Sequence, residues 1–316
     1  MLSIILDLND PCFNLACEEY LLHNRQEDFI ILSVNDPAII IGKHQVAHSE
    51  VNIQFVEEKK IPVIRRISGG GTVYHDRGNL NYAFIRQSES GKQVDFRLYT
   101  QPVIDFLHSA GVEAIFERKN DLTVNGLKIS GNAEHVFRER VLHHGTLLFD
   151  VKLDNLRQSL KKRTENYSTR GVESNRTPVT NLKNKYLNIE NISLLMTGML
   201  EFFRNNIPDV RTFRLSDDEI SAIHSLAETK YKTWEWNWGY GPPYTFTNRF
   251  KVNEILHNCR FLVRDGIIWA CDIEGSTEMA VAGKKLIGVR HMYHDLLKVF
   301  RSEKVTISDE EVYKFF

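Results

Sequence analysis

Residues 65–76 read RRISGGGTVYHD and join two segments that have the composition of β-strands. Three consecutive glycines, Gly69, Gly70 and Gly71, cost backbone conformational entropy. A common reason for such a run is that a ligand approaches the backbone N–H groups closely, as phosphates do in glycine-rich loops. The neighbouring Arg65 and Arg66 add charge-assisted donors for the same anion. The stretch therefore indicates an anion-binding loop, with a tight glycine turn between two solvated arginines as the alternative.

The elements around this loop do not alternate regularly between strand and helix, which favours an α+β fold with a mixed sheet over a doubly wound parallel sheet. The Walker motif and the Gly-x-Gly-x-x-Gly pattern are both absent from the loop. Asn9-Asp10-Pro11 predicts a helix start, and Ser216 with Glu219 predicts a capping box. The expected strands are residues 2–8, 29–34, 38–41, 62–66, 72–75 and 80–86, and further helices are expected near 49–60, 98–110, 193–206 and 216–230.

A second informative stretch reads NDLTVNGLKISGNA at residues 120–133. Asn125-Gly126 between two apolar segments predicts a two-residue hairpin, which places Lys128 on a strand. A lysine there can point inward as a cation for a carboxylate or phosphate, whereas the alternative is a solvent-facing lysine on an alternating strand. His143 and His144 are adjacent on another expected strand, so their side chains point to opposite faces and metal binding by this pair is disfavoured.

These segments together closely resemble the lipoate-protein ligase A family of the biotin and lipoate ligase superfamily. The resemblance is carried by residues 65–81, by Lys128-Ile-Ser-Gly131 and by His143-His-Gly-Thr-Leu147. It is extended by Phe13-Asn-Leu-Ala with Glu18-Glu19, by Ile41-Gly-Lys-His-Gln45, by Val179-Thr-Asn-Leu182 and by the tryptophan-rich stretch at 234–239. It runs in order along residues 10–245, and the remaining residues match as a small accessory domain.

The resemblance implies a catalytic domain with the biotin/lipoate ligase fold, similar to class II aminoacyl-tRNA synthetases, at residues 1–245. A small α+β C-terminal domain would then occupy residues 246–316. The implied reaction has two steps: lipoate and ATP form lipoyl-AMP, and a lysine of a lipoyl carrier domain then takes the lipoyl group. The loop at 161–181, especially residues 169–172, resembles the segment that closes over the adenylate in this family.

The resemblance also assigns the site residues of this ATP-dependent, adenylate-forming ligase. Lys128 is the catalytic residue and contacts both the lipoyl carboxyl group and the α-phosphate. The implied cofactors are ATP and Mg²⁺, with lipoate as substrate. Asp121 is the metal candidate from its position near Lys128: it could approach the metal or the adenine or orient Lys128, and a plain strand-end acid is the alternative. The ATP-binding residues are Arg66, Gly71, Thr72, Val73, Tyr74 and Lys128, and the lipoate-binding residues are Lys128, Ser68, Gly70, His75 and His144.

The implied partners are the acyltransferase subunits of 2-oxoacid dehydrogenase complexes and the glycine-cleavage carrier protein. A rival is an enzyme of the same fold that transfers the acyl group through a cysteine thioester, but no cysteine lies between Cys17 and Cys259. A biotin ligase is disfavoured because its Gly-Arg-Gly-Arg loop is missing. A lipoyl-AMP-dependent transferase that does not activate free lipoate stays open, because it needs the same motifs.

Two positions depart from the family pattern. Ser33 stands where a tryptophan often follows the strand leucine, and Asn132 replaces a small hydroxyl residue after Ser-Gly. These changes bear on the shape of the acyl or nucleotide pocket more than on the reaction class. Trp234, Trp236 and Trp238 are expected to be packing anchors at a domain boundary and not stacking platforms for a ligand.

Composition limits the other classes of function. The 316 residues contain 40 Lys+Arg and 41 Asp+Glu, so the net charge of −1 gives no basic excess for nucleic acid or an anionic membrane surface. No apolar run approaches the length of a membrane span, and the N-terminus resembles neither a signal nor a transit peptide. With only four cysteines, a reducing cytoplasm is the expected location.

Overall fold

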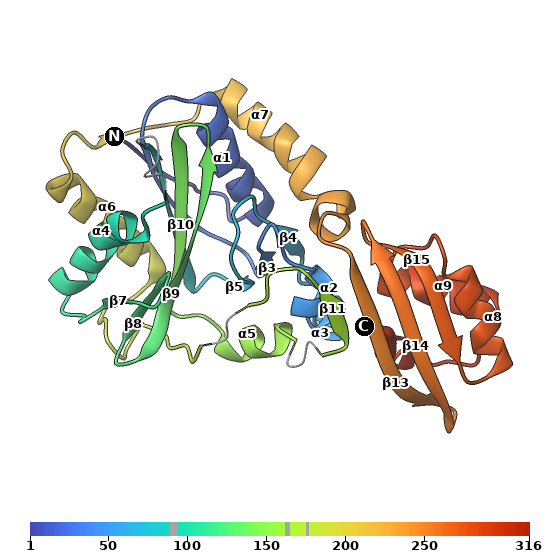
Figure 1. Cartoon of the computed structure of the whole chain (residues 1–316). Helices are drawn as coiled ribbons and strands as arrows, with labels where there is room; N and C mark the ends of the chain where they lie inside the picture. The colour runs from blue at the N-terminus through green and yellow to red at the C-terminus, as the bar shows by residue number, and fades with distance from the viewer. Residues whose placement is uncertain (89–93, 162–164, 175–176) are drawn as a thin grey trace.

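The computed structural model describes residues 1–88, 94–161, 165–174 and 177–316 (Figure 1). Its largest element is an eight-stranded mixed sheet with the order β12-β1-β2-β6-β10-β9-β8-β7. The β12-β1-β2 pairs are parallel, and every pair from β2-β6 onward is antiparallel. The strands are β1 (Leu2–Ile5), β2 (Phe29–Val34), β6 (Asn79–Gln87), β7 (Ile115–Glu117), β8 (Asp121–Val124), β9 (Leu127–Phe137), β10 (Arg140–Leu148) and β12 (Arg211–Thr212).

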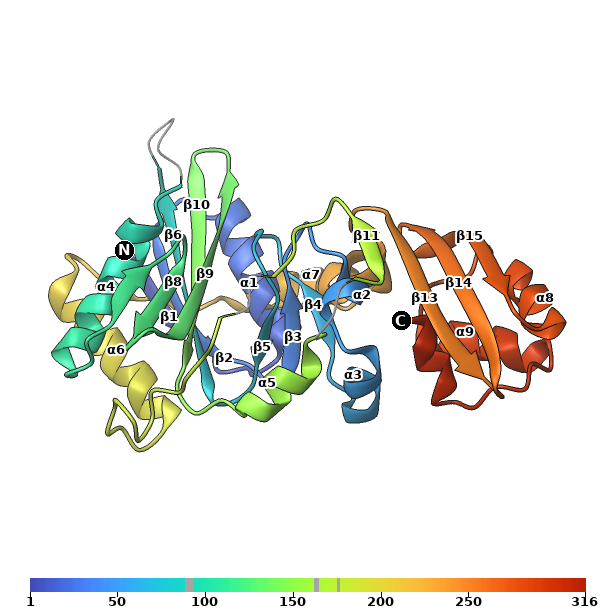
Figure 2. The ribbon, with the colours of Figure 1, turned by 60° about the horizontal axis from the view of Figure 1, so that its bottom comes forward.

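Helices cover both faces of this sheet. In Figure 2, α4 (Phe96–Ser109) and α6 (Ile192–Asn206) lie on one side, and α1 (Pro11–Asn24) lies on the other. Alternate side chains along β2 and β6 join separate hydrophobic clusters: Leu32 and Phe84 pack with α4 and α6, whereas Ile31 and Ile85 pack with α1. This period-two division of one sheet between two cores confirms the predicted α+β architecture.

A smaller three-stranded sheet, ordered β4-β3-β5, carries the glycine-rich loop between two of its strands. The expected helix at 49–60 is wrong in detail. It is interrupted because Val51 forms a β-bridge with Leu160 and Asn52 caps a new helix. The elements here are β3 (Ala38–Ile41), α2 (Ala47–Glu50), α3 (Ile53–Lys59), β4 (Val63–Arg65), β5 (Val73–His75) and α5 (Leu153–Ser159).

Local sequence signals place several element ends correctly. Asp10 caps α1, with Pro11 at its first position, and Ser216 with Glu219 forms the predicted capping box of α7 (Asp217–Leu226). π-helical turns at Ala227–Tyr231 and Glu235–Gly239 follow α7. Asn125-Gly126 has positive φ at both residues, as a type I′ hairpin turn requires.

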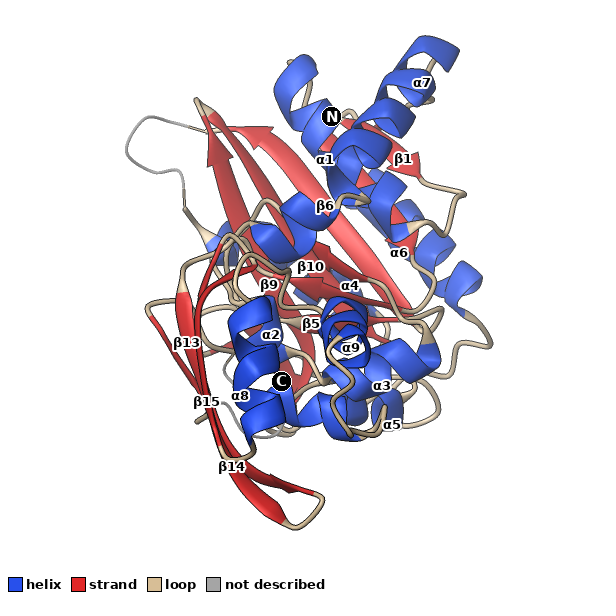
Figure 3. Ribbon diagram, turned by 90° about the vertical axis from the view of Figure 1, so that its right-hand side faces the viewer, coloured by secondary structure: helices blue, strands red, loops and turns tan. Residues whose placement is uncertain are grey.

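The C-terminal residues form a four-stranded sheet, β11-β13-β14-β15, with α8 and α9 on one face (Figure 3). Its edge strand β11 (Tyr167–Thr169) comes from the segment 161–181 that was expected to be a loop. Residues 162–164 and 175–176 of that loop lie outside the described residues. The other elements are β13 (Tyr244–Val252), β14 (Ile255–Arg264), β15 (Ile267–Glu274), α8 (Thr277–Lys285), α9 (Tyr293–Ser302) and a 3₁₀ helix at Glu311–Phe315.

The division between residues 245 and 246 stays a prediction. It falls just inside β13, and one hydrophobic cluster runs across it, joining Ile39 and Val63 to Phe246 and Phe261. In the described part of the chain, no helix has both the length and the apolar character needed to cross a membrane.

Candidate active site

A cavity of about 740 Å³ lies between the glycine-rich loop and the large sheet. Its walls come from α1, the end of β2, the glycine-rich loop, the β8-β9 hairpin, β10 and residues 172–174. All the predicted site residues line it except Ser68 and Tyr74. Segments separated by more than 100 positions in the sequence therefore meet in one place, as the fold resemblance implied.

Arg66 is the buried cation of the loop. Its Nη2 donates to the carbonyl oxygens of Gly69 and Gly71, and its Nε donates to Ser68 Oγ at 2.9 Å. Burial lowers the pKa of Arg66 to about 10, because the charged form loses hydration, but the group stays protonated at neutral pH. None of the ion pairs found between described residues includes it, so its charge is available to an anion in the cavity.

Arg65 does not share this role, which corrects the expectation that both arginines face the same anion. Its side chain is fully buried and donates to the carbonyls of Gly42, Gln45, Trp236 and other residues. Trp236 Nε1 donates back to Arg65 O at 2.7 Å. Neighbouring residues of a strand point to opposite faces, so Arg65 ties the tryptophan-rich segment to the loop while Arg66 faces the cavity. This exchange confirms the predicted packing role of Trp236.

The glycines allow the 172–174 segment to close against the loop. Gly70 has φ +85°, and a Cβ on Gly71 would lie 3.0 Å from Ser174 Oγ. Ser174 Oγ accepts from Thr72 N–H at 2.8 Å and from Gln45 Nε2 at 3.1 Å. Part of the reason for the glycine run is therefore internal packing, in addition to any ligand.

Lys128 and Asp121 form an ion pair with 2.6 Å between Nζ and Oδ1. The β8-β9 ladder has a bulge between Leu122 and Thr123, and the extended Lys128 side chain crosses Gly131, where a Cβ would be 3.1 Å from Lys128 Cε. The Lys128 backbone also pairs with Val179. Lys128 therefore points inward into the cavity and is not a solvent-facing strand lysine.

A chain of polar contacts runs from Arg66 through Ser68 and His144 to Glu18. Ser68 Oγ accepts from Arg66 and lies 2.6 Å from His144 Nε2, and His144 Nδ1 lies 2.7 Å from Glu18 Oε2. Ser68 thus holds two residues of the cavity wall in place. The motif that contains Glu18 predicts no role for this residue, because its partner His144 is 126 positions away in the chain.

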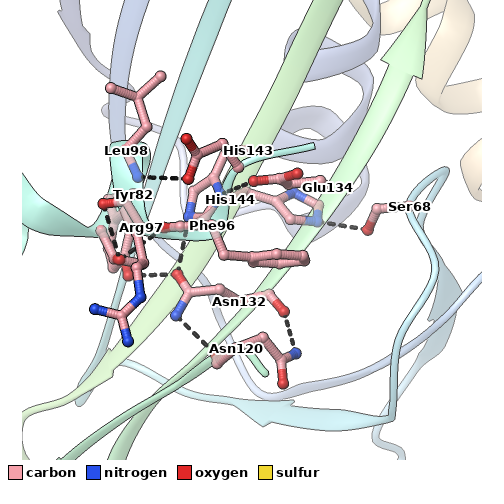
Figure 4. A network of polar contacts seen from close by, with 12 residues as sticks. Ser68, Tyr82, Phe96, Arg97, Leu98, Asn120, Asn132, Glu134, His143 and His144 are labelled. Carbon is pink, nitrogen blue, oxygen red and sulfur yellow. Dashed lines mark hydrogen bonds and ion pairs between the residues drawn. The ribbon is translucent and has the colours of Figure 1, made fainter. Parts of the chain in front are cut away.

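His143 points to the opposite face of β10, as strand alternation predicts, and belongs to a separate buried network (Figure 4). His143 Nδ1 lies 2.8 Å from Glu134 Oε1, and its Nε2 lies 3.1 Å from Asn132 Oδ1. Burial raises the pKa of Glu134 to about 7 and lowers that of His143 to about 3. Burial therefore disfavours the charged form of both members of this pair.

Asn132, one of the two departures from the family pattern, is held by this network. Tyr82 O–H donates to Asn132 Oδ1 at 2.6 Å, and Asn132 Nδ2 donates to Asn120 O at 3.0 Å. A Cβ on Gly145 would lie 2.2 Å from Asn132 Oδ1. The amide therefore fills the space beside Gly145 and fixes Asn120, the neighbour of Asp121 in the cavity wall.

Two predicted residues and the cysteines lie away from the cavity. Tyr74 points to the other face of β5, where it is 1% exposed within a hydrophobic cluster, so only its backbone is near the loop. None of the described lining residues is a cysteine. Burial raises the pKa of Cys12 to about 12 and raises that of Cys17 further, which keeps both thiols protonated and unreactive.

Among the described residues, no group of three or more His, Cys, Asp or Glu side chains could hold a metal ion. Asp121, the predicted metal residue, is 4% exposed and pairs with Lys128. A metal at Asp121 would therefore need ligands from a bound substrate.

The cavity, the glycine-rich loop and the mixed sheet define a class of protein. The lipoyl protein ligase A/B catalytic domain family matches residues 10–201, and the chain belongs to this family of enzymes.

Individual relatives and solved structures support the same family assignment. Lipoate-protein ligase LplJ of Bacillus subtilis is 38% identical over 278 residues, which cover 85% of this chain and 82% of the relative. A bipartite lipoate protein ligase of Thermoplasma acidophilum, reported with its E2 lipoyl domain, has a TM-score of 0.65 and 26% identity, covering 76% of this chain and 97% of that one. A lipoate-protein ligase A structure bound with ATP has a TM-score of 0.64 and 27% identity, covering 76% of this chain and 100% of that one. The recognised fold and enzyme class are thereby confirmed.

Proposed function

We propose that this ligase activates free lipoate with ATP to lipoyl-AMP and then transfers the lipoyl group to a lysine of a lipoyl carrier domain. The observation that carries the proposal is the placement of two inward cations, Arg66 and Lys128, on the walls of one cavity. The ATP-bound relative and the Thermoplasma ligase with its lipoyl domain support both halves of the reaction.

The first step needs little acid–base chemistry. A carboxylic acid with a pKa of about 4.3 is already ionised at neutral pH, so its oxygen can attack the α-phosphorus of ATP and release pyrophosphate. The barrier comes from bringing two anions together, which alignment and fixed positive charges lower. Arg66, held by four internal acceptors, and Lys128, held by Asp121, supply those charges without reorganising.

In the second step, the carrier lysine amine attacks the acyl carbon of the mixed anhydride and AMP leaves. Lys128 faces the developing charge in both steps, because the carboxyl carbon and the α-phosphate are joined in the intermediate. Residues 172–174, held on the loop through Ser174, form the wall that would cover the adenylate.

Mg²⁺ fits Asp121 as an ion that arrives with the nucleotide. This ion is usually bound through one or two carboxylates together with substrate phosphates, and Asp121 offers a carboxylate oxygen beyond the one that Lys128 contacts. When bound, Mg²⁺ would neutralise phosphate charge there. Asp121 would hold the ion and also orient Lys128.

We further propose that the carriers are acyltransferase subunits of 2-oxoacid dehydrogenase complexes and the glycine-cleavage carrier protein. The likeness to a ligase that is reported with an E2 lipoyl domain supports this partner class. We propose a cytoplasmic location as well, which the free state of all four cysteines supports.

The test is lipoate-dependent exchange of labelled pyrophosphate into ATP by the purified protein with magnesium. Octanoate and biotin are run in parallel, with Lys128→Ala as the negative variant and Lys59→Ala, an exposed lysine of α3, as the matched control. Exchange with lipoate that survives in Lys59→Ala and is lost in Lys128→Ala supports the proposal. Absence of exchange together with transfer from supplied lipoyl-AMP would favour the transferase that depends on another activating enzyme.

A further inference from the structure

Glu134 and His143 form a buried acid–base pair that lies beside the cavity and not in its wall (Figure 4). Glu134 Oε1 is 2.8 Å from His143 Nδ1, and the two side chains are 3% and 0% exposed. Phe96 and Tyr99 of α4 pack on the His143 ring, with ring centroids 5.7 and 5.0 Å away. Taking two ionisable groups out of water is costly. Because neither residue reaches the cavity, any role of the pair in catalysis acts through a neighbour.

The hydrogen bonds around Asn132 require His143 to be a donor. Asn132 Nδ2 donates to the backbone carbonyl oxygen of Asn120 at 3.0 Å, and a carbonyl oxygen can only accept. Asn132 Oδ1 therefore faces the other way, toward the Tyr82 hydroxyl at 2.6 Å and His143 Nε2 at 3.1 Å. The amide oxygen is an acceptor as well, so His143 Nε2 carries a proton and donates to it.

This donation is possible only while Glu134 and His143 share one further proton. A neutral imidazole has a single N–H, so a proton on Nε2 leaves Nδ1 as an acceptor, and Glu134 then donates to it as a carboxylic acid. An imidazolium beside a carboxylate gives the same bond to Asn132, since both ring nitrogens are then protonated. Loss of the shared proton leaves a carboxylate, which draws the remaining N–H to Nδ1 and turns the Nε2 lone pair toward Asn132 Oδ1. The pair therefore has two states, and only the protonated one bonds Asn132.

The surroundings of the pair set when that proton is lost. The titratable and charged groups that face it are Tyr82 on β6, His144 on β10, Asp95 and Tyr99 of α4 and its N-terminus, and the Arg86–Asp28 ion pair near Tyr99. Both tyrosines stay protonated, because burial raises the pKa of Tyr99 to about 12 and that of Tyr82 further. Burial raises the pKa of Glu134 to about 7, and the negative charge of Asp95 also disfavours the carboxylate. The pair consequently loses its shared proton as the pH rises through the neutral range.

A short series of contacts connects Asn132 to the catalytic lysine. Asn132 N–H donates to Asn120 O at 3.0 Å, and Asn120 Nδ2 donates back to Asn132 O. Asn120 precedes Asp121, whose Oδ1 is 2.6 Å from Lys128 Nζ. All four residues line the cavity. When His143 directs a lone pair at Asn132 Oδ1, a repulsive contact replaces a hydrogen bond, and the amide that holds this part of the wall is displaced.

We propose that Glu134 and His143 are positioning residues of the ligase: the proton that they share keeps His143 a donor to Asn132, and this bond holds the Asn120–Asp121 wall where Lys128 needs it. The inference rests on the proposed function, because it assumes that Lys128 promotes adenylation. Activation of the acid is then fastest while the pair holds its proton, and loss of the proton loosens the wall without removing any residue from it.

The test is the pH dependence of kcat/KM for ATP in lipoate-dependent pyrophosphate exchange, measured between about pH 6 and 9. The glutamine amide of Glu134→Gln donates to His143 Nδ1 at every pH, so this variant keeps the arrangement of the protonated pair. We expect its activity relative to wild type to rise about fivefold over this range, the effect of about one buried hydrogen bond. The ratio cancels the titration of every group that the two proteins share. A merely structural role changes activity by the same factor at every pH, so a constant ratio overturns the proposal.

Two further variants accompany this comparison. Glu139→Gln, at an exposed position in the turn between β9 and β10, is the matched control, and we expect its ratio to wild type to stay constant. His143→Phe keeps an aromatic ring against α4 and removes the donor, so we expect about fivefold lower activity than in Glu134→Gln at every pH. Equal activity of these two variants overturns the role of the hydrogen bond. If His143→Phe does not fold, the Glu134→Gln ratio decides the proposal.

Nitrogen NMR spectra of the histidine-labelled wild-type protein read the tautomer of His143 without any assay of activity. We expect the ring N–H to move from Nε2 to Nδ1 as the pH rises, and an Nε2–H that persists up to about pH 9 overturns the proposal. Failure of the proposed function is distinguishable: exchange is then absent from every variant at every pH, whereas failure of this inference alone leaves exchange with a constant ratio.

Discussion

Removing the Lys128 side chain tests the catalytic proposal most directly. Lys128 Nζ is 2.6 Å from Asp121 Oδ1, and 21% of the Lys128 side chain is exposed. Two opposite unit charges about 4 Å apart, such as Lys128 and a ligand oxyanion, attract each other by about 4 kcal/mol at an effective dielectric of about 20. The partial exposure of Lys128 to solvent reduces this attraction. Loss of one fixed donor for a developing oxyanion typically costs 10²–10³ in rate, about 2.7–4 kcal/mol. We expect Lys128→Ala to lose about 100-fold in kcat/KM.

The assay measures both half-reactions separately, as lipoate-dependent pyrophosphate exchange and as transfer from supplied lipoyl-AMP. Lys128→Met keeps the apolar stem that crosses Gly131 and loses only the charge, so we expect the same loss as for alanine. Restoration of exchange by methionine would show that packing and not charge matters. A Lys128→Ala protein within tenfold of wild type in adenylation would refute the assignment altogether.

Three further predictions concern other parts of the molecule. Burial lowers the pKa of His291 to about 3 in the folded protein. As the pH falls below about 6.5, this histidine is therefore protonated in the unfolded chain before it is protonated in the folded one. The free energy of unfolding should consequently fall by up to about 1.4 kcal/mol per pH unit between about pH 6.5 and 3. Urea midpoints at pH 7.5 and 5.0 that do not differ would contradict this. Gly71→Ala brings a Cβ to 3.0 Å from Ser174 Oγ and should raise the KM for ATP several-fold in exchange assays, with an unchanged KM as the contrary result. Alanine at Cys12 or Cys17 should leave the rates of exchange and transfer within about twofold of the wild-type rates. A large loss of transfer would support the thioester mechanism instead.

Signals confined to neighbouring residues were predicted well from the sequence. The cap and proline at Asp10 and Pro11, the box at Ser216 and the Asn125-Gly126 hairpin depend on hydrogen bonds and φ angles within a few residues. The break at Val51 was missed because it depends on pairing with Leu160, which is more than 100 positions away.

The residues of the candidate site show the same difference between local sequence signals and contacts made by distant segments. Its motif residues, Arg66 and Lys128 among them, were named from the sequence, because a glycine-rich loop and a lysine before Ser-Gly are local patterns. The opposite roles of Arg65 and Arg66 required their partners to be known. Strand alternation separates the two side chains, but it does not say which of them faces the cavity.

The sequence by itself determined the class of enzyme, the order of its main elements and most of the residues on the activating side of the cavity. Only the tertiary structure decided which polar side chains pair in the cavity wall, where Asn14, Asn35 and His75 come from a helix, a loop and a second sheet. The physical reason is that an amide in the sequence is equally consistent with a surface, a turn or a buried network. Its role follows from the hydrogen bonds that burial leaves it, and those are made between segments that only the fold brings together.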